Sequence, residues 1–536
     1  MTAVCWTAAY AQEALPSRSL TIEGAYNPTV SESQKIMPVP EKSVSDRKAS
    51  AVTYLTDTNP LTGMQRNPMG AFAQNSDDVP SPDYYGLVRF GYGLRNIHDG
   101  VLDFGWKISE KDQLKVSGLM DAWSTKTVEE WKSRMFNSDL NALYSHSFDA
   151  FTLNVDGALG YSHFNYREGV NMTPAMKDLS SLLQKTGRER LGVSAKGGND
   201  TLDWHAGLSM EWLSRNGLDV AGTTSDNREF LLRLEGGITL PVMGGTGGLE
   251  YRQKMASYDW QGMNGCDYSC FTTITVTPFW KYTWRGIDAN MGVNVDLRSG
   301  PGYALLFSPM VTAAYRLNES VSFTAGVTGG VEDNNMRRLS AISPYWSESK
   351  RIRDGYTLFD ASAGASYNQG TWLTLSGKGG YRHTLDELFQ IADDDNIVTS
   401  LLKQETLDVF YIRLDADMQF ADRAQVKMDM TCNGYTGKYS EGVLALNPVL
   451  DASLFGKVNI IPGLDAMLTY RMMSFSKIAG SRMPMVNDLA LTVDYDFRPD
   501  LSLYVTGNRL AGGDWFYYAG YRSVKPSVMV GATYRF

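Results

Sequence analysis

The sequence has no apolar run long enough for a membrane-spanning helix, although it contains 536 residues. Such a helix needs about 18 or more consecutive apolar residues. The chain also lacks basic clusters: its net charge is −9 and its pI is about 5.3, so nucleic-acid binding has no support. It has only five histidines, and none lies in a metalloprotease motif or beside a nucleophile elbow. We therefore expect no enzyme active site and no cofactor.

Cysteine is scarce too, with four in the whole chain. Cys266 and Cys270 are four positions apart in a predicted loop, and in an oxidising compartment they are candidates for a small disulfide. A metal pair is the less favoured alternative, because no histidine or second cysteine pair lies nearby in the sequence. We expect Cys432 to be an unpaired small apolar residue in a strand.

A regular alternation of polar and apolar residues is present instead, from about Tyr84 to Phe536. Successive side chains of a strand point to opposite faces, so each segment of about ten residues has one polar face and one apolar face. In the last segment, the two faces consist of Val528, Val530, Ala532, Tyr534 and Phe536, and of Met529, Gly531, Thr533 and Arg535. The series predicts a transmembrane antiparallel up-and-down β-barrel with a polar lumen, which agrees with a mean hydropathy of only −0.27.

Connections between these segments alternate between short turns and longer loops, as in bacterial outer-membrane barrels. We count about 22 strands. An even number places both termini on one side, which in such barrels is the periplasm. A soluble propeller or a set of sandwiches would also alternate, but neither explains the two lengths of connection or the tyrosines and tryptophans at segment ends, which resemble membrane girdles.

Charged residues of both signs occupy the predicted inner face. Our candidates for lining the lumen are Asp203, His205, Glu211, Arg233, Glu235, Glu250, Arg252, Asp288, Asp296, Arg298, Asp494 and Arg498. Opposite charges on neighbouring strands would stiffen the wall by about 0.2–1 kcal/mol per pair. The same residues are also compatible with the inside of any large barrel.

The longest predicted loops cover about 165–187, 331–355 and 383–406. Thr173-Pro174, the leucine spacing and Gly187 predict a short amphipathic helix in the first loop, and Leu385, Leu388 and Phe389 predict a helical turn in the third. These helices could fold into the mouth, or the loops could simply be solvated. Residues 393–396, three aspartates and an asparagine, could bind Ca²⁺, although the spacing of a known calcium loop is incomplete.

The N-terminal part lacks the alternation. Residues 1–11 are similar to the remnant of a signal peptide, because Ala9-Tyr10-Ala11 forms an A-x-A cleavage site. Residues 12–83 are rich in Pro, Ser, Asn and Asp, and we expect an extended segment in the periplasm or in the lumen. The barrel would then occupy residues 84–536.

The last hairpin resembles that of TonB-dependent receptors in its residues 501–510, 515–517, 520–522 and 528–536. In that family the closing strand, here ending in Tyr534 and Phe536, resembles the signal read by the barrel-assembly machinery. Near the N-terminus, Tyr26, Pro28, Lys35 and Ile36 resemble a segment of TonB-dependent-receptor-like proteins of Bacteroidetes. The resemblance implies an outer-membrane barrel whose partners are TonB or a periplasmic or lipoprotein partner, besides outer-membrane lipid and lipopolysaccharide.

The chain departs from that family in its N-terminal segment. Residues 12–83 are too few for a full plug domain, and the glycine-rich strands of the plug are not visible. Two functions follow as hypotheses. The first is transport of a polar solute, by a receptor-like or porin-like barrel. The alternative is a structural barrel without flux, which would anchor a lipoprotein or assembly partner through residues 20–40 and the loops.

Overall fold

A computed structural model describes residues 84–536 with gaps in the connections. Residues 1–83 lie outside the described part, as do residues 95, 127–131, 166–182, 200, 219–223, 261–269, 301, 347–352, 371, 392–400, 421–422, 440–442, 445–446, 476, 479–480, 483, 514, 519–520 and 524. The predicted signal-peptide remnant and the segment of Tyr26, Pro28, Lys35 and Ile36 are therefore outside it.

Twenty-two strands form one closed antiparallel barrel. The first half comprises β1 (Tyr84–Gly93), β2 (Ile97–Lys107), β3 (Asp112–Lys126), β4 (Lys132–Ser147), β5 (Phe151–Asn165), β6 (Leu183–Asn199), β7 (Leu202–Leu218), β8 (Thr224–Val242), β9 (Gly245–Trp260), β10 (Cys270–Trp284) and β11 (Ile287–Gly300). The second half comprises β12 (Gly302–Arg316), β13 (Val321–Glu332), β14 (Gly355–Gln369), β15 (Leu373–Ile391), β16 (Leu401–Phe420), β17 (Ala424–Tyr435), β18 (Pro448–Ile461), β19 (Leu464–Phe475), β22 (Val486–Arg498), β23 (Leu501–Asn508) and β26 (Ser527–Arg535).

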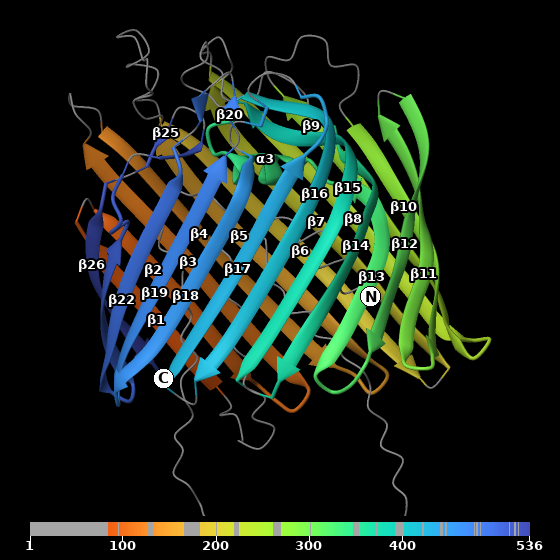
Figure 1. The fold of residues 1–536 in the computed structure, drawn as a ribbon, viewed down its shortest axis with the longest axis horizontal. Coiled ribbons are helices and arrows are strands. Elements are labelled where there is room, and N and C mark those ends of the chain that lie inside the picture. Colours follow the sequence, from red (N-terminus) through yellow and green to blue (C-terminus); the bar gives the residue numbers. More distant parts are fainter. Residues whose placement is uncertain are drawn as a thin grey trace, which may run out of the picture.

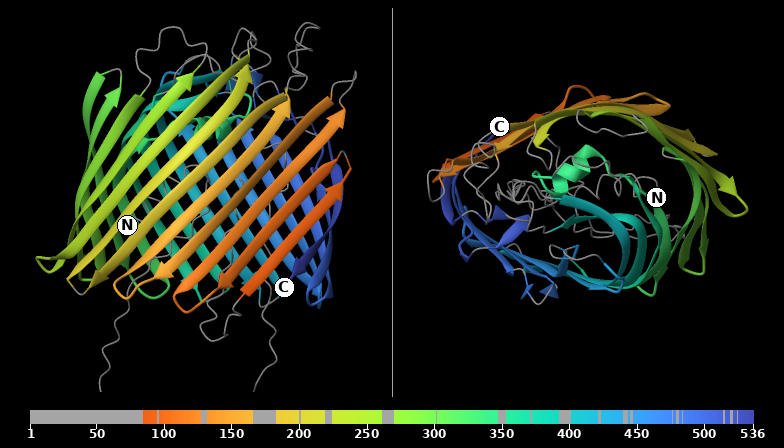
Figure 2. Two further views of the ribbon diagram at one scale, coloured as in Figure 1. Left: turned by 180° about the vertical axis from the view of Figure 1, so that it is seen from behind. Right: turned by 90° about the horizontal axis from the view of Figure 1, so that it is seen from above.

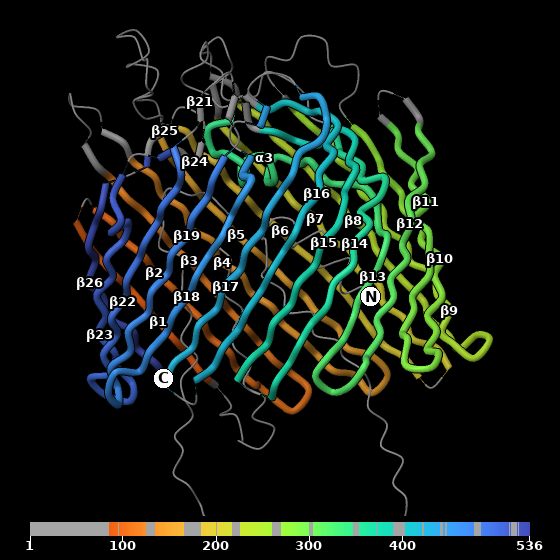
Figure 3. The backbone as a smooth tube through the Cα atoms, in the orientation of Figure 1, coloured from red at the N-terminus to blue at the C-terminus, as the bar shows by residue number. Residues whose placement is uncertain are grey.

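Each barrel strand pairs with its neighbours along the chain, and β1 pairs with β26 to close the barrel (Figure 1). The closing register runs from Leu87 opposite Arg535 to Gly93 opposite Met529. The backbones of Gly86 and Phe536 exchange two hydrogen bonds of 2.7 and 2.9 Å just beyond it. The predicted up-and-down barrel of about 22 strands is therefore confirmed. Figure 3 shows its tilted strands rising and falling in turn.

The two faces of the barrel differ as the alternation predicts. Val530 is 58% exposed on the outer face, whereas its neighbour Met529 is 1% exposed on the inner face. Outward-facing apolar residues such as Leu305 and Phe307 are exposed in the same way, while buried polar residues such as Asp296 face inward. A closed barrel whose outer face is rich in exposed apolar side chains suits a lipid surrounding.

Short turns gather at one rim, and the longer connections gather at the other (Figure 1). At the short-turn rim, Met243-Gly244 and Arg285-Gly286 each have two consecutive positive φ angles, of 50° and 73° and of 48° and 81°. Two positive φ values mark the type I′ turn, whose twist matches that of the hairpin. The C-terminus lies at this same rim.

The long-loop rim carries the small extra elements. They are the hairpins β20 (Lys477–Ile478) with β21 (Ser481–Arg482) and β24 (Phe516–Tyr518) with β25 (Tyr521–Arg522), and the helix α3 (Met336–Ile342). The helix lies in the second predicted long loop, between β13 and β14.

Both helix predictions fail where the structure describes the residues. Residues 183–187 form the start of β6, and Leu385, Leu388 and Phe389 belong to β15. The described residues of the third loop, 383–391 and 401–406, are strand because β15 and β16 continue to pair there, with a register shift between Thr384 and Glu387. Asp386 at this bulge has a φ of +54°. Such a bulge re-aims the strand, and leucine spacing alone does not reveal it. The Thr173-Pro174 start of the first predicted helix lies outside the described residues.

Candidate functional site

A segment between β13 and β14 folds into the mouth of the barrel. We call residues 333–346 together with 353–354 the mouth strap. Viewed from above, its helix α3 lies inside the ring of strands (Figure 2). Met336, Leu339 and Trp346 of the strap form a buried apolar cluster with Leu213 of β7 and Leu388 of β15. Because the partners come from separate strands of the wall, the cluster fixes the strap across the opening.

The two ends of the strap meet at one lysine. Lys254 Nζ of β9 lies 2.5 Å from Asp333 Oδ1 and also binds Oδ2 of Asp354. The backbone N–H of Asn334 donates to Asp354 Oδ1 at 3.0 Å, and Arg298 donates to the Asp354 carbonyl at 2.8 Å. Lys254 therefore closes the base of the loop, as one cation held between two carboxylates.

The charge balance at this base favours ionised carboxylates. Burial acts to raise the pKa of Asp333, but the ammonium of Lys254 and the guanidinium of Arg233 lower that pKa well below its usual range. Arg233 also binds Glu211 at 2.5 Å and Asp333 at 3.5 Å. Two predicted lumen residues, Glu211 and Arg233, thus help to hold the strap.

Polar groups of β7 and β8 hold the backbone of the strap. Glu229 accepts a 2.9 Å hydrogen bond from the N–H of Met336 at the start of α3. Arg215 donates to the carbonyls of Pro344 and Trp346 at 2.9 and 3.2 Å. Its guanidinium also lies 4.2 Å from the centre of the Trp346 ring. Backbone groups of a loop inside a barrel need such partners because burial without them is costly.

A second set of contacts ties the strap to the opposite wall. Arg338 of α3 lies 3.0 Å from Glu332 and 3.5 Å from Glu387 of β15. Gln404 of β16 accepts from the N–H of Arg353 at 2.8 Å and donates to its carbonyl at 2.6 Å. The strap is therefore attached at both sides of the mouth, as a fixed constriction rather than a free loop.

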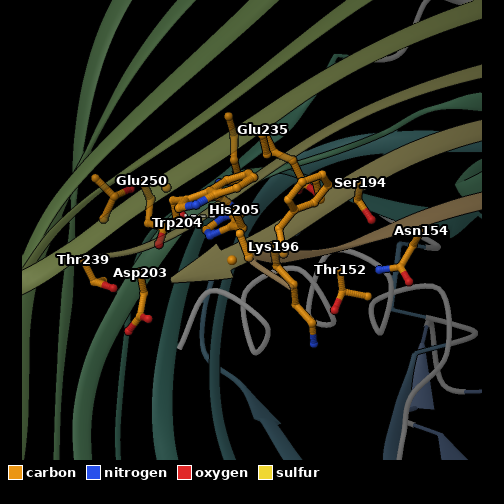
Figure 4. A pocket seen from close by; sticks show the side chains of 18 of the residues that line it. Thr152, Asn154, Ser194, Lys196, Asp203, Trp204, His205, Glu235, Thr239 and Glu250 are labelled. Atoms are coloured by element: carbon orange, nitrogen blue, oxygen red, sulfur yellow. Dashed lines mark ion pairs between the residues drawn. The ribbon is translucent and has the colours of Figure 1, made fainter. Parts of the chain in front are cut away.

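A pocket of about 760 Å³ lies along the wall nearer the short-turn rim. Figure 4 shows the side chains that line it, among them Lys196, His205, Glu235 and Glu250. His205 Nε2 is 3.2 Å from Glu250 Oε2. Carboxylates, basic groups and hydroxyls from neighbouring strands face one another here. The pocket therefore offers a polar solute both hydrogen-bond donors and acceptors, and charges of both signs.

The other predicted lumen residues have separate positions. Asp203 and Arg252 line the same pocket as His205. Asp296 accepts from Thr275 at 2.5 Å and from Tyr356 at 3.0 Å, and Arg298 holds the strap. Asp288 and Arg498 lie toward the short-turn rim, where they contact Thr283 at 2.7 Å and Asp500 at 3.1 Å. Asp494 lies opposite Tyr504 near the closing strands.

The sequence reasoning missed the strap. Arg215, Arg338, Asp333 and Asp354 were not among the predicted site residues. One local signal was available: Asn335 precedes an apolar Met-x-x-Leu pattern and caps the helix, accepting from the N–H of Arg338 at 2.8 Å. Cys266 and residues 393–396 lie outside the described part, so the disulfide and the Ca²⁺ site stay predictions. Within the described part, no group of three or more His, Cys, Asp or Glu is arranged to hold a metal ion.

No family model matches the sequence, and no curated relative matches it significantly. Among the helices that the structure describes, none is long and apolar enough to span a membrane. Solved structures are similar in fold. They include a point mutant of the ferric enterobactin receptor PfeA from Pseudomonas aeruginosa, with 14% identity and a TM-score of 0.61, covering 85% of this chain and 81% of that one.

Two further structures match over similar lengths. The siderophore receptor PirA from Acinetobacter baumannii has 12% identity and a TM-score of 0.65, covering 85% of this chain and 81% of that one. The FrpB iron transporter from Neisseria meningitidis has 11% identity and a TM-score of 0.64, covering 85% and 82%. The chain therefore shares the barrel fold of these structures, which is the fold that the resemblance of its last hairpin implies.

Proposed function

We propose that this chain is a non-enzymatic barrel of the bacterial outer membrane that transports a polar solute through its lumen. The observation that carries the proposal is a closed 22-strand barrel with an apolar exterior and a polar, charged interior. The similar structures carry the names of receptors and a transporter. The pocket around His205 and Glu250 offers the solute hydrogen-bond partners of both kinds.

The difference between the two rims supports one orientation of the barrel in the membrane. We propose that the short-turn rim, with both termini, faces the periplasm and that the mouth strap faces outward. Residues 1–11 would be a signal-peptide remnant, and residues 12–83 a periplasmic or plug-like segment. Within it, Tyr26, Pro28, Lys35 and Ile36 are the candidates for contact with TonB or with a periplasmic or lipoprotein partner. Tyr534 and Phe536 would serve as the assembly signal.

Iron complexes are the first solutes to test. The similar structures are named for ferric enterobactin, for iron and for siderophores. A ferric siderophore is large and polar, and the mixed charges of the lumen could contact its oxygen atoms. The strap would then set the size of the opening through which such a complex passes.

Conductance in planar bilayers tests transport against the alternative of an anchoring barrel. We expect the full-length chain to conduct little, and the chain without residues 12–83 to form a stable, larger conductance. Uptake of ferric enterobactin into cells that depend on the barrel would test the solute. A barrel that stays closed in both forms would overturn transport and leave the anchoring function, in which residues 20–40 and the loops bind a partner.

A further inference from the structure

A basic and aromatic cluster lies on the outer face of the barrel at the long-loop rim. Phe136 of β4, His163 of β5 and Lys185 of β6 are direct cross-strand partners in one row. The Phe136 and His163 rings stack at 5.2 Å, and Tyr161 lies 5.7 Å from His163. Arg134 precedes Phe136 on the same face of β4. We call these five residues the rim cluster.

The rim cluster faces away from the lumen. Its strand neighbours Met135 and Phe164 point inward, since Met135 packs on the inner cluster around Trp123 and Phe164 contacts Tyr345 of the mouth strap at 5.2 Å. Successive residues of a strand alternate between faces. Arg134 and His163 therefore lie on the side that the barrel turns toward the membrane.

The two cations of the cluster have no acidic partner in the described part of the chain. Neither Arg134 nor Lys185 forms an ion pair there, and Lys185 is exposed. On this face of β6 the next charged residue is Glu189, four positions and roughly 13 Å further along the strand. Arg134 of β4 and Lys185 of β6 lie two strands apart, on either side of His163 of β5. Positive charges that face the same side of the wall repel one another, so this arrangement favours a bound anion between them.

Other charges on the outer face are arranged differently. His146 lies 2.6 Å from Asp112 near the short-turn rim, and Tyr144 donates to the same carboxylate at 2.5 Å. His383 likewise lies 2.6 Å from Asp408 nearer the long loops. The carboxylates of Asp112 and Asp408 thus have hydrogen-bonding partners on neighbouring strands. The rim cluster instead leaves Arg134 and Lys185 available, and its row of rings supplies the interfacial surface that suits a headgroup.

We infer that the rim cluster binds the phosphate of a phosphorylated lipid headgroup in the outer leaflet. A guanidinium matches two phosphate oxygens with parallel N–H donors, and the lysine ammonium adds a second charge. The backbone of Arg134 is fixed for this role, because its N–H donates to Asn165 Oδ1 at 2.7 Å and Asn165 is buried. The rings of Phe136 and Tyr161 would lie beside the upper part of the acyl chains.

Lipid retention on the full-length protein tests the inference. The probes are lipid A with its phosphates and the same lipid A after their removal, added to the purified barrel in detergent and counted by native mass spectrometry. We expect the wild type to retain the phosphorylated form roughly tenfold more strongly. We expect Arg134→Gln with Lys185→Gln to abolish that preference while binding of the dephosphorylated form stays the same.

Arg228→Gln is the matched control, because Arg228 is an exposed cation on the same outer face, in β8, with Asp259 as its cross-strand partner. It should leave the preference intact. If the double variant does not show the heat-modifiable mobility of a folded barrel, Lys185→Gln alone replaces it. Equal retention by wild type and variant would overturn the inference. So would tight binding of inorganic phosphate alone at low millimolar concentration, because the site would then hold a free anion and not a lipid.

Discussion

The hydroxyl of Tyr504 donates a hydrogen bond of 2.8 Å to Oδ1 of Asp99, although the two residues are 405 positions apart. The contact lies at the seam where β26 and β23 meet β1 and β2. Arg89 completes it: its Nε is 3.8 Å from Asp99 Oδ2, and its guanidinium lies 3.7 Å from the centre of the Tyr504 ring. Two glycines, Gly91 and Gly531, leave the space that the ring fills.

Gly531→Ala should destabilise the seam. A Cβ at Gly531 would lie 2.3 Å from Tyr504 Cζ and 2.5 Å from the Phe90 carbonyl oxygen, and a backbone atom cannot easily move away. Overpacking of this kind costs about 1–3 kcal/mol. Urea unfolding of the refolded barrel, followed by tryptophan fluorescence, measures the loss. Gly456→Ala is the matched control because open space surrounds that position. An equal effect of both substitutions would contradict the packing argument.

Tyr504→Phe tests the hydrogen bond separately from the packing. The ring remains, but Asp99 loses a donor while it stays buried, so we expect the free energy of unfolding to fall by about 1–3 kcal/mol. The exposed Tyr495, on the outer face of the neighbouring strand, provides the control Tyr495→Phe, which should change little. If Tyr504→Phe also has no effect, Arg89 alone satisfies the carboxylate.

The wall of the barrel could be predicted from the sequence, whereas the strap could not. The alternation of Val528 to Phe536 is a local property with a period of two, and it repeats in every strand. The strap depends on contacts such as Lys254 with Asp333, between residues 79 positions apart, and no local pattern encodes them. The helical spacing of Leu385 and Leu388 was misleading because the bulge at Asp386 changes which way these side chains point.

For the same reason, the sequence predicts which polar residues line the lumen but not which of them contact one another. The period of two predicts that Glu211, Arg233 and Asp296 lie on the inner face of the barrel. Which of these groups meet depends on the register between strands and on the inward loop, since Arg233 binds both Glu211 and Asp333. Cross-strand register is set by pairing along the whole strand, and short windows of sequence do not contain it.

We predict that the ionised carboxylate of Asp333 stabilises the folded protein and that this contribution is lost at acidic pH. Its pKa in the folded protein is lowered by Lys254 and Arg233 despite burial, so its contribution to stability is fully present above the unfolded pKa of about 4 and is lost as the pH falls through the lower folded value. The difference in free energy of unfolding between wild type and Asp333→Asn should therefore be constant from about pH 5 to 8 and shrink below about pH 4. Unfolding at a series of pH values measures it. A difference that grows in acid would show that the carboxyl is already protonated in the folded state.

Lys254→Met should open the mouth. The substitution keeps a long apolar side chain but leaves the buried Asp354 and the half-buried Asp333 without their shared cation. Breaking a buried ion pair such as that of Lys254 with Asp354 costs about 3–5 kcal/mol. The strap can avoid that cost by leaving its place, so we expect the conductance of the barrel lacking residues 12–83 to rise relative to the same form with Lys254. Lys281→Met is the control, because Lys281 also faces the lumen but contacts the Phe279 ring at 5.0 Å instead of a carboxylate. Increased conductance in both variants would point to the loss of a lumen charge, and unchanged conductance with Lys254→Met would mean that the contacts of Arg215 and Arg338 suffice to hold the strap.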